Sequence, residues 1–77
     1  MKYYVARKRK TTGRIDLQRC KGLSNYWVSP EYAKRSPGDV WQFSKRGAEN
    51  IINRYNKSNA RGWYEYLIIP VSDILTS

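Results

Sequence analysis

Two neighbouring stretches decide the fold: residues 44–55, which read SKRGAENIINRY, and residues 63–71, which read WYEYLIIPV. Four apolar residues of the first stretch recur at the spacing of one helix face, namely Ala48, Ile51, Ile52 and Tyr55. Ser44 stands where an N-cap hydroxyl accepts an amide hydrogen from the first turn. The second stretch is the most β-prone run in the chain. A helix with one apolar stripe packs on an apolar sheet, so we expect Ile52, in mid-stripe, to be buried between them.

The segments before the helix predict further strands. Residues 2–8 and 15–18 alternate as strands and should form an antiparallel hairpin, with a loop of four or five residues in which Gly13 can adopt a positive φ. Residues 26–29 suggest a short third strand. Pro30 then begins a helical turn that Ser29 can cap.

These elements predict an α+β fold. It consists of a small antiparallel sheet of three or four strands with one main helix packed on one face, in the order β-β-(β)-α-β. The chain of 77 residues forms a single domain, 1–77. Residues 56–62 are expected to form the loop between the main helix and the last strand.

The charge of the chain is high and uneven. Fifteen Lys and Arg against six Asp and Glu give a net charge of +9. Residues 1–21 hold eight of the bases and one acid, whereas residues 62–77 hold two acids and no base. Such a field attracts polyanions, either nucleic acid or an acidic protein face; a membrane surface is not the expected partner.

Composition argues against several classes of protein. There is no histidine and only one cysteine, Cys20, so neither a zinc site nor a disulfide is expected, and no cofactor is expected. Without a histidine to activate Cys20, we do not expect an enzyme. The first residues contain no apolar run of signal-peptide or membrane-spanning length, so we expect a cytoplasmic protein.

The densest group of cations lies around the predicted hairpin turn, at Arg7, Lys8, Arg9, Lys10 and Arg14. One interpretation is a prong that contacts phosphates. The alternative is a solvated hairpin tip whose charges prevent edge-to-edge aggregation. Five bases without an acid among them exceed what solubility needs, and we expect polyanion contact.

Two further sets of residues are candidates for binding. Lys45 and Arg46 oppose the dipole at the start of the main helix, where free amides and two bases can hold a phosphate, although a solvated pair is an equal alternative. Three tyrosines are candidates for stacking on bases if the main helix covers the Leu67 side of the sheet and leaves the other side open: Tyr4, Tyr64 and Tyr66. The alternative, which we favour, is that these rings only cover a thin sheet.

Several elements together form a recognisable pattern: YYV at residues 3–5, WVS at residues 27–29, Ala33, FSKRGA at residues 43–48 and YEYLIIPV at residues 64–71. The pattern resembles small α+β proteins common in bacteriophage and prophage genomes, with residues 34–39 as an insertion. The resemblance implies phage origin and a protein that binds and inhibits or redirects a host machine, as host-takeover and anti-defence proteins do. It implies no functional residue.

The resulting prediction is a non-catalytic basic protein that engages nucleic acid, or a nucleic-acid-bound host complex, through the charged hairpin. The rival prediction is a protein-only inhibitor that docks its basic face on the acidic, nucleic-acid-receiving surface of a host or defence enzyme. A third possibility is a small structural subunit whose charge serves only solubility.

Overall fold

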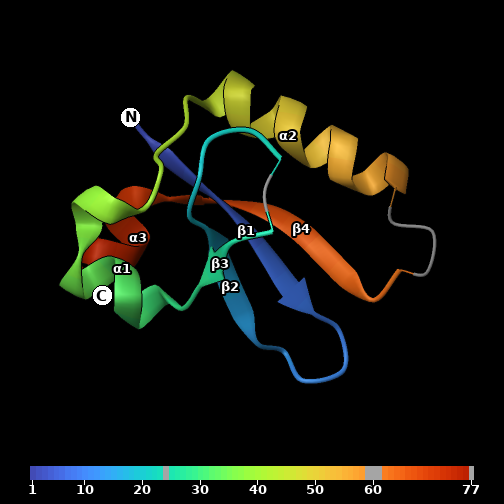
Figure 1. The fold of residues 1–77 in the computed structure, drawn as a ribbon, viewed down its shortest axis with the longest axis horizontal. Coiled ribbons are helices and arrows are strands. Elements are labelled where there is room, and N and C mark those ends of the chain that lie inside the picture. Colours follow the sequence, from blue (N-terminus) through green and yellow to red (C-terminus); the bar gives the residue numbers. More distant parts are fainter. Residues whose placement is uncertain (24, 59–61, 77) are drawn as a thin grey trace.

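The chain folds into a four-stranded antiparallel sheet with helices on both faces (Figure 1). The computed structural model describes residues 1–23, 25–58 and 62–76. In chain order the elements are β1 (Tyr3–Arg9), β2 (Ile15–Gln18), β3 (Trp27–Val28), α1 (Pro30–Arg35), the 3-10 turn η1 (Pro37–Asp39), α2 (Lys45–Ser58), β4 (Tyr64–Pro70) and α3 (Val71–Leu75). The strands lie in the order β3-β2-β1-β4, so the predicted α+β fold is confirmed.

The predicted hairpin joins β1 and β2. Its register places Arg7 opposite Asp16 and Lys8 opposite Ile15. The Arg9 amide donates to the Arg14 carbonyl at 2.9 Å, and the Gly13 amide donates to the Arg9 carbonyl at 2.7 Å. Gly13 has a φ of 73°, a left-handed conformation that glycine adopts without strain. The turn therefore has the geometry that the sequence predicts.

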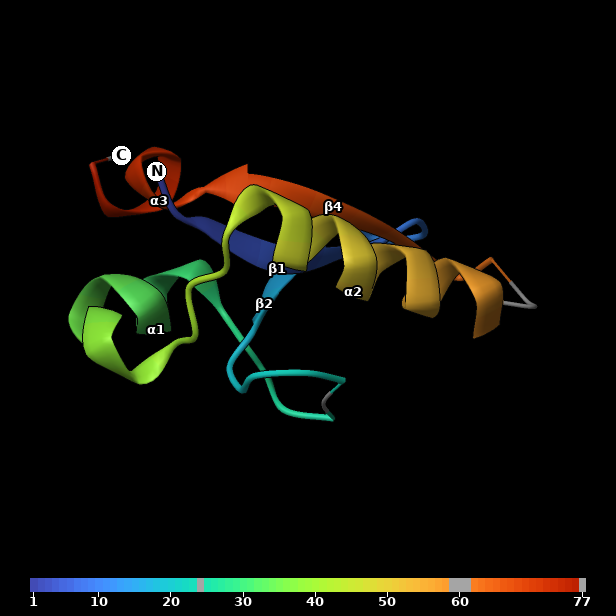
Figure 2. The same ribbon diagram turned by 90° about the horizontal axis from the view of Figure 1, so that it is seen from above.

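Helix α2 covers one face of the sheet, as Figure 2 shows. Ser44 caps it as predicted, since its Oγ accepts the Gly47 amide at 3.1 Å. Ala48 and Ile51 are buried against Val5, whereas Ile52 is only partly buried. The apolar stripe is thus centred on Ile51 rather than on Ile52. The helix runs to Ser58, so residues 56–58 of the predicted loop are helical, and residues 59–61 lie outside the described residues.

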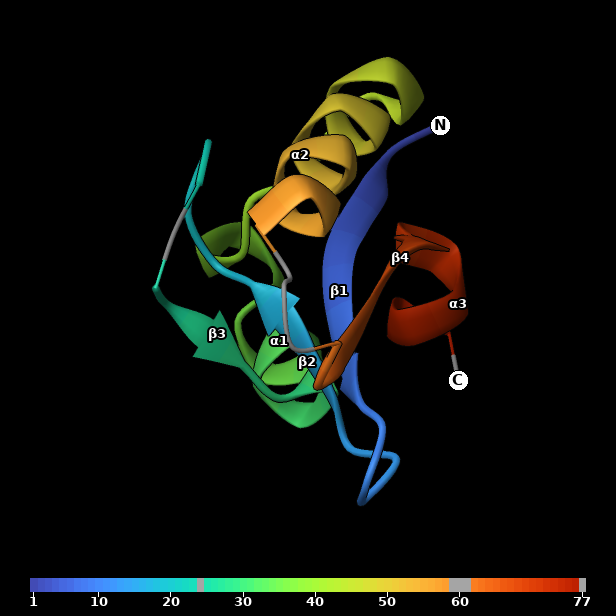
Figure 3. The same cartoon turned by 90° about the vertical axis from the view of Figure 1, so that its right-hand side faces the viewer.

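The opposite face of the sheet is also covered, by α1 and α3. The sequence analysis predicted the helical turn at Pro30, but it did not predict that helices cover this face. Tyr4, Ala6 and Leu17 are fully buried there, in a second core that includes Ala33 of α1 and Ile74 of α3. Figure 3 shows α2 and α3 on opposite sides of β1 and β4. The sheet therefore separates two small cores.

Gln18 is the one buried polar side chain among the described residues. Its Oε1 accepts a hydrogen bond from the Tyr55 hydroxyl at 2.6 Å. Its Nε2 donates to the carbonyl oxygens of Cys20, at 2.7 Å, and Gly22. The amide is therefore satisfied at both ends, and it ties the loop after β2 to helix α2.

A second polar link joins the end of β2 to η1. The Arg19 guanidinium donates to the Asp39 carboxylate at 2.8 Å, and the Tyr32 hydroxyl donates to the same carboxylate. The hydrogen bonds from Tyr32 and Arg19 lower the pKa of Asp39 below its ordinary value. The native fold therefore favours the ionised carboxylate.

This lowered pKa predicts a pH-dependent contribution to stability. A carboxylate whose pKa is depressed by folding stabilises the native state above its unfolded pKa of about 3.9, and the contribution is lost as pH falls through the folded pKa. We therefore expect the wild type to melt at a higher temperature than Asp39→Asn at pH 6. The difference should shrink as pH falls below about 3.9 and disappear once the pH is below the folded pKa of Asp39. A difference in melting temperature that persists unchanged in acid would contradict this role of Asp39.

Candidate nucleic-acid interface

The candidate interface is the hairpin end, which we define as the end of β1, the turn that follows and the start of β2. It lies on the same side of the molecule as the C-terminal end of α2 and the beginning of β4 (Figures 1 and 2). Four of the five predicted cations are exposed there: Lys8, Arg9, Lys10 and Arg14. Within the described chain their only ion pair joins Arg14 Nε to Asp16 Oδ1 at 3.3 Å. The remaining charges are available to a partner.

Arg7, the fifth predicted cation, differs from the other four. Its guanidinium carbon lies 4.5 Å from the centre of the Trp27 ring and 4.6 Å from the centre of the Tyr64 ring. Its Nε is buried and has no hydrogen-bond partner in the described part of the chain. Arg7 is therefore held between two aromatic rings instead of projecting from the turn. The sequence analysis placed Arg7 in the exposed prong. In the structure its guanidinium instead packs between two rings and supports the strand that carries the exposed cations.

The rings beside Arg7 form a packed cluster. Tyr66 stacks on Tyr55 of α2 with a centroid distance of 4.8 Å and an angle of 10°. Trp27 lies 5.7 Å from Tyr55 and 6.3 Å from Tyr66. Burial raises the pKa of the Tyr66 phenol, and the Arg7 guanidinium acts in the opposite direction. Because α2 covers this side of the sheet, Tyr64 and Tyr66 do not lie on the open face considered in the sequence analysis.

Tyr4 is the candidate that the structure excludes from stacking on a ligand. Its register partner in β4 is Ile69, so it lies on the face opposite to Tyr64 and Tyr66. It is fully buried in the core beneath α1 and α3. The three tyrosines therefore do not form one platform.

Lys45 and Arg46 are exposed at the start of α2. The helix has 14 residues, which corresponds to a length of roughly 20 Å between this pair and the helix end beside the hairpin. The structure therefore places Lys45 and Arg46 at the opposite end of α2 from the hairpin end. The cations of the hairpin end lie together without this pair. One phosphate cannot bridge the two sets.

The described residues contain no cluster of three or more His, Cys, Asp or Glu side chains that could hold a metal ion. Cys20 is exposed and unpaired with another cysteine. None of the described helices is long and apolar enough to cross a membrane.

Comparisons with family models, with curated proteins and with solved structures gave no match for this chain. The resemblance to small phage proteins therefore remains a prediction, and function has to be inferred from the hairpin end itself.

Proposed function

We propose that this chain is a non-catalytic nucleic-acid-binding protein that contacts phosphates through its hairpin end. The observation that carries the proposal is the group of four exposed cations at the hairpin end, with Arg14–Asp16 as the one ion pair among them in the described residues. Phosphate contacts by Lys and Arg supply most of the affinity of sequence-independent binding. The partner would be nucleic acid, free or within a host complex if the phage resemblance holds.

Further cations lie in the C-terminal part of α2, where Arg54 and Lys57 are exposed. This end of the helix is on the same side of the molecule as the hairpin end (Figure 1). The acids nearest the turn are Asp16, which pairs with Arg14, and Glu65, which lies opposite Lys8 in the register. The local excess of positive charge supports attraction of a polyanion over distances of about 10 Å at 0.1 M salt.

The aromatic cluster gives this surface a rigid base. The Arg7 guanidinium between Trp27 of β3 and Tyr64 of β4 connects β1 to the two edge strands of the sheet. Lys8 and Arg9 therefore extend from a fixed strand, which reduces the entropy lost when they contact phosphates. Because phosphate contacts carry no base information, we expect affinity that varies little with sequence.

Direct binding to naked nucleic acid tests the proposal. Duplex and single-stranded DNA and RNA of equal length are titrated with the wild type and with Lys34→Gln/Arg35→Gln. This variant removes two exposed charges from α1, at the other end of the molecule. We expect both proteins to bind every probe, and the variant to lose only the small affinity due to its lower net charge. A wild type that binds none of the probes at 0.05 M salt would refute the proposal.

The packed tyrosine cluster favours one alternative function. Since Tyr66 stacks on Tyr55, this face offers bases no open platform, which suits a partner recognised by charge alone. The alternative is an inhibitor that docks the hairpin end on an acidic protein surface. A pull-down from bacterial lysate that retains the same host protein after nuclease treatment, by a chain that does not bind naked nucleic acid, would favour it.

A further inference from the structure

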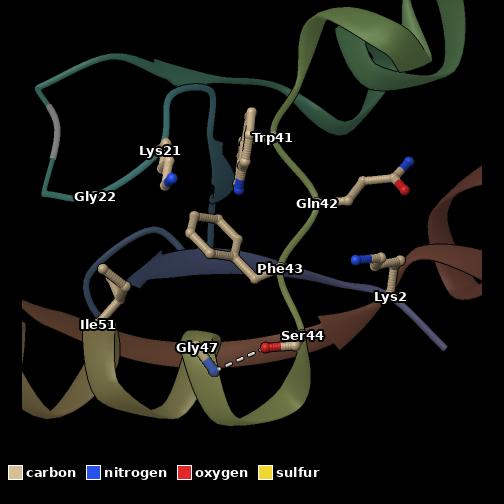
Figure 4. A pocket seen from close by; sticks show the side chains of 9 residues that line it. All are labelled: Lys2, Lys21, Gly22, Trp41, Gln42, Phe43, Ser44, Gly47 and Ile51. Atoms are coloured by element: carbon tan, nitrogen blue, oxygen red, sulfur yellow. Dashed lines mark hydrogen bonds between the residues drawn. The ribbon is translucent and has the colours of Figure 1, made fainter.

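A cavity of about 370 Å³ lies at the other end of α2 from the hairpin, between the start of the helix, the segment leading into it and the loop after β2 (Figure 4). Its size is within the range of about 300–1,000 Å³ that is typical of ligand pockets. Its lining includes Lys2, Lys21, Trp41, Phe43, Gly47 and Ile51. Among the described residues, no acidic side chain lines it.

One side of the cavity is aromatic and apolar. Trp41 is 44% exposed, whereas Phe43 and Ile51 beside it are buried. The Lys21 ammonium lies 5.7 Å from the centre of the Trp41 ring. A half-exposed indole on the wall of a cavity provides a stacking surface for a flat aromatic ring, and the buried neighbours keep that side apolar.

The lining also carries two lysines. In Figure 4 Lys21 lies beside Trp41, whereas Lys2 lies on the other side of the segment that carries Gln42 and Phe43, with its ammonium directed toward that segment. Lys45 and Arg46 follow at the start of α2, whose first turn contains no acid. Lys45 and Arg46 oppose the dipole of α2, so an anion bound near its first turn would be stabilised.

From this lining we infer that the cavity binds a nucleotide, with the base stacked on Trp41 and the 5′-phosphate held by the lining lysines. A nucleotide supplies a flat ring and a dianion on one small molecule, which is the combination that the lining requires. The source is a free nucleotide or the 5′-phosphorylated end of a strand. The cavity shares no residue with the hairpin end, so the inference does not depend on the proposed function.

The test is a nuclear magnetic resonance titration of the ¹⁵N-labelled chain with adenosine 5′-monophosphate, adenosine and inorganic phosphate. The monophosphate should shift the Trp41 indole N–H and the backbone amides of Arg46 and Gly47. Adenosine and phosphate should each bind about tenfold more weakly, because each lacks one of the two contacts. Addition of 5′-phosphorylated and unphosphorylated oligonucleotides distinguishes the two sources.

Variants of the lining residues test whether the chemical-shift changes arise from binding in the cavity. Trp41→Ala and Lys2→Gln/Lys21→Gln should each weaken binding of the monophosphate about tenfold. If Trp41→Ala fails to fold, the lysine variant still tests the inference, because both lysine side chains are exposed and their replacement should leave the fold unchanged. The control is Trp63→Ala, which removes another exposed tryptophan and should bind normally.

Shifts at the cavity produced only by the 5′-phosphorylated oligonucleotide would support the inference, with the strand end as ligand. Unchanged affinity in both cavity variants, or no shift at the cavity with any probe, would overturn it. A chain that binds the monophosphate but none of the unphosphorylated duplex and single-stranded DNA and RNA probes would refute the proposed function and leave this inference standing.

Discussion

The variant Lys8→Gln/Lys10→Gln is expected to bind duplex DNA about 8- to 60-fold more weakly than the wild type at 0.1 M salt. Each phosphate contact contributes about 0.9 logarithmic units of affinity per tenfold dilution of salt below 1 M, so the two limits correspond to one and two lost contacts. Both side chains are exposed, so the free energy of unfolding should change by less than about 0.5 kcal/mol. Fluorescence anisotropy with labelled duplexes measures the affinities.

The loss should be the same for duplexes of unrelated sequence, because contacts to phosphate carry no base information. The variant Lys34→Gln/Arg35→Gln controls for the change in net charge. Equal losses in the two variants would show that only overall charge matters, and would remove the hairpin end from the binding site.

The variant Ile51→Ala is expected to lower the free energy of unfolding by about 2–5 kcal/mol. Ile51 is 9% exposed and packs in the core that joins α2 to Val5 and Phe43. Truncation removes buried apolar surface and leaves a cavity between helix and sheet. For a chain of this length the total free energy of unfolding is about 4–12 kcal/mol, so the variant should be partly unfolded near 37 °C. Urea denaturation followed by circular dichroism measures the change.

The matched variant Ile52→Ala should cost less, about 1–2 kcal/mol, because Ile52 is only partly buried. The order of the two costs tests the rotation of α2 on the sheet. A larger cost at Ile52 than at Ile51 would contradict the packing described for this helix.

Local signals in the sequence were sufficient to predict the main helix, the hairpin and the start of α1. Ser44 and Ser29 mark helix starts because a hydroxyl there accepts a first-turn amide, and the structure has both caps. Gly13 marks the turn because of its positive φ. Alternation along β1 correctly separated Tyr3, Val5 and Arg7 from Tyr4 and Ala6. Each of these inferences depends on residues close together in the chain.

The sequence analysis missed the register of β1 against β4 and the second core, and both depend on contacts between distant segments. The register of β1 against β4 pairs Arg7 with Tyr66 and Tyr4 with Ile69, and no local pattern specifies that pairing. A register shifted by one residue would have put Tyr4 on the same face of the sheet as Tyr66, as the stacking hypothesis assumed. The second core was missed for a similar reason: α1 and α3 have six and five residues, too short to show an apolar stripe.

The candidate interface was predictable in part. The run of cations at residues 7–10 is visible in the sequence, and four of the five predicted hairpin cations are exposed together. The position of Arg7 was not predictable, because Trp27 and Tyr64 reach it from strands on either side. An arginine flanked in sequence by other bases gives no sign that two rings from elsewhere will enclose it.

Phosphate contact by the hairpin end is tested by one measurement, the salt dependence of DNA binding by the wild type and by Lys8→Gln/Lys10→Gln. For the wild type, log affinity should fall steeply against log salt concentration, by about 0.9 per contacted phosphate on a duplex and about 0.7 on a single strand. The variant should be flatter by about one to two units. Identical slopes for the two proteins would contradict the proposal that these side chains meet phosphates.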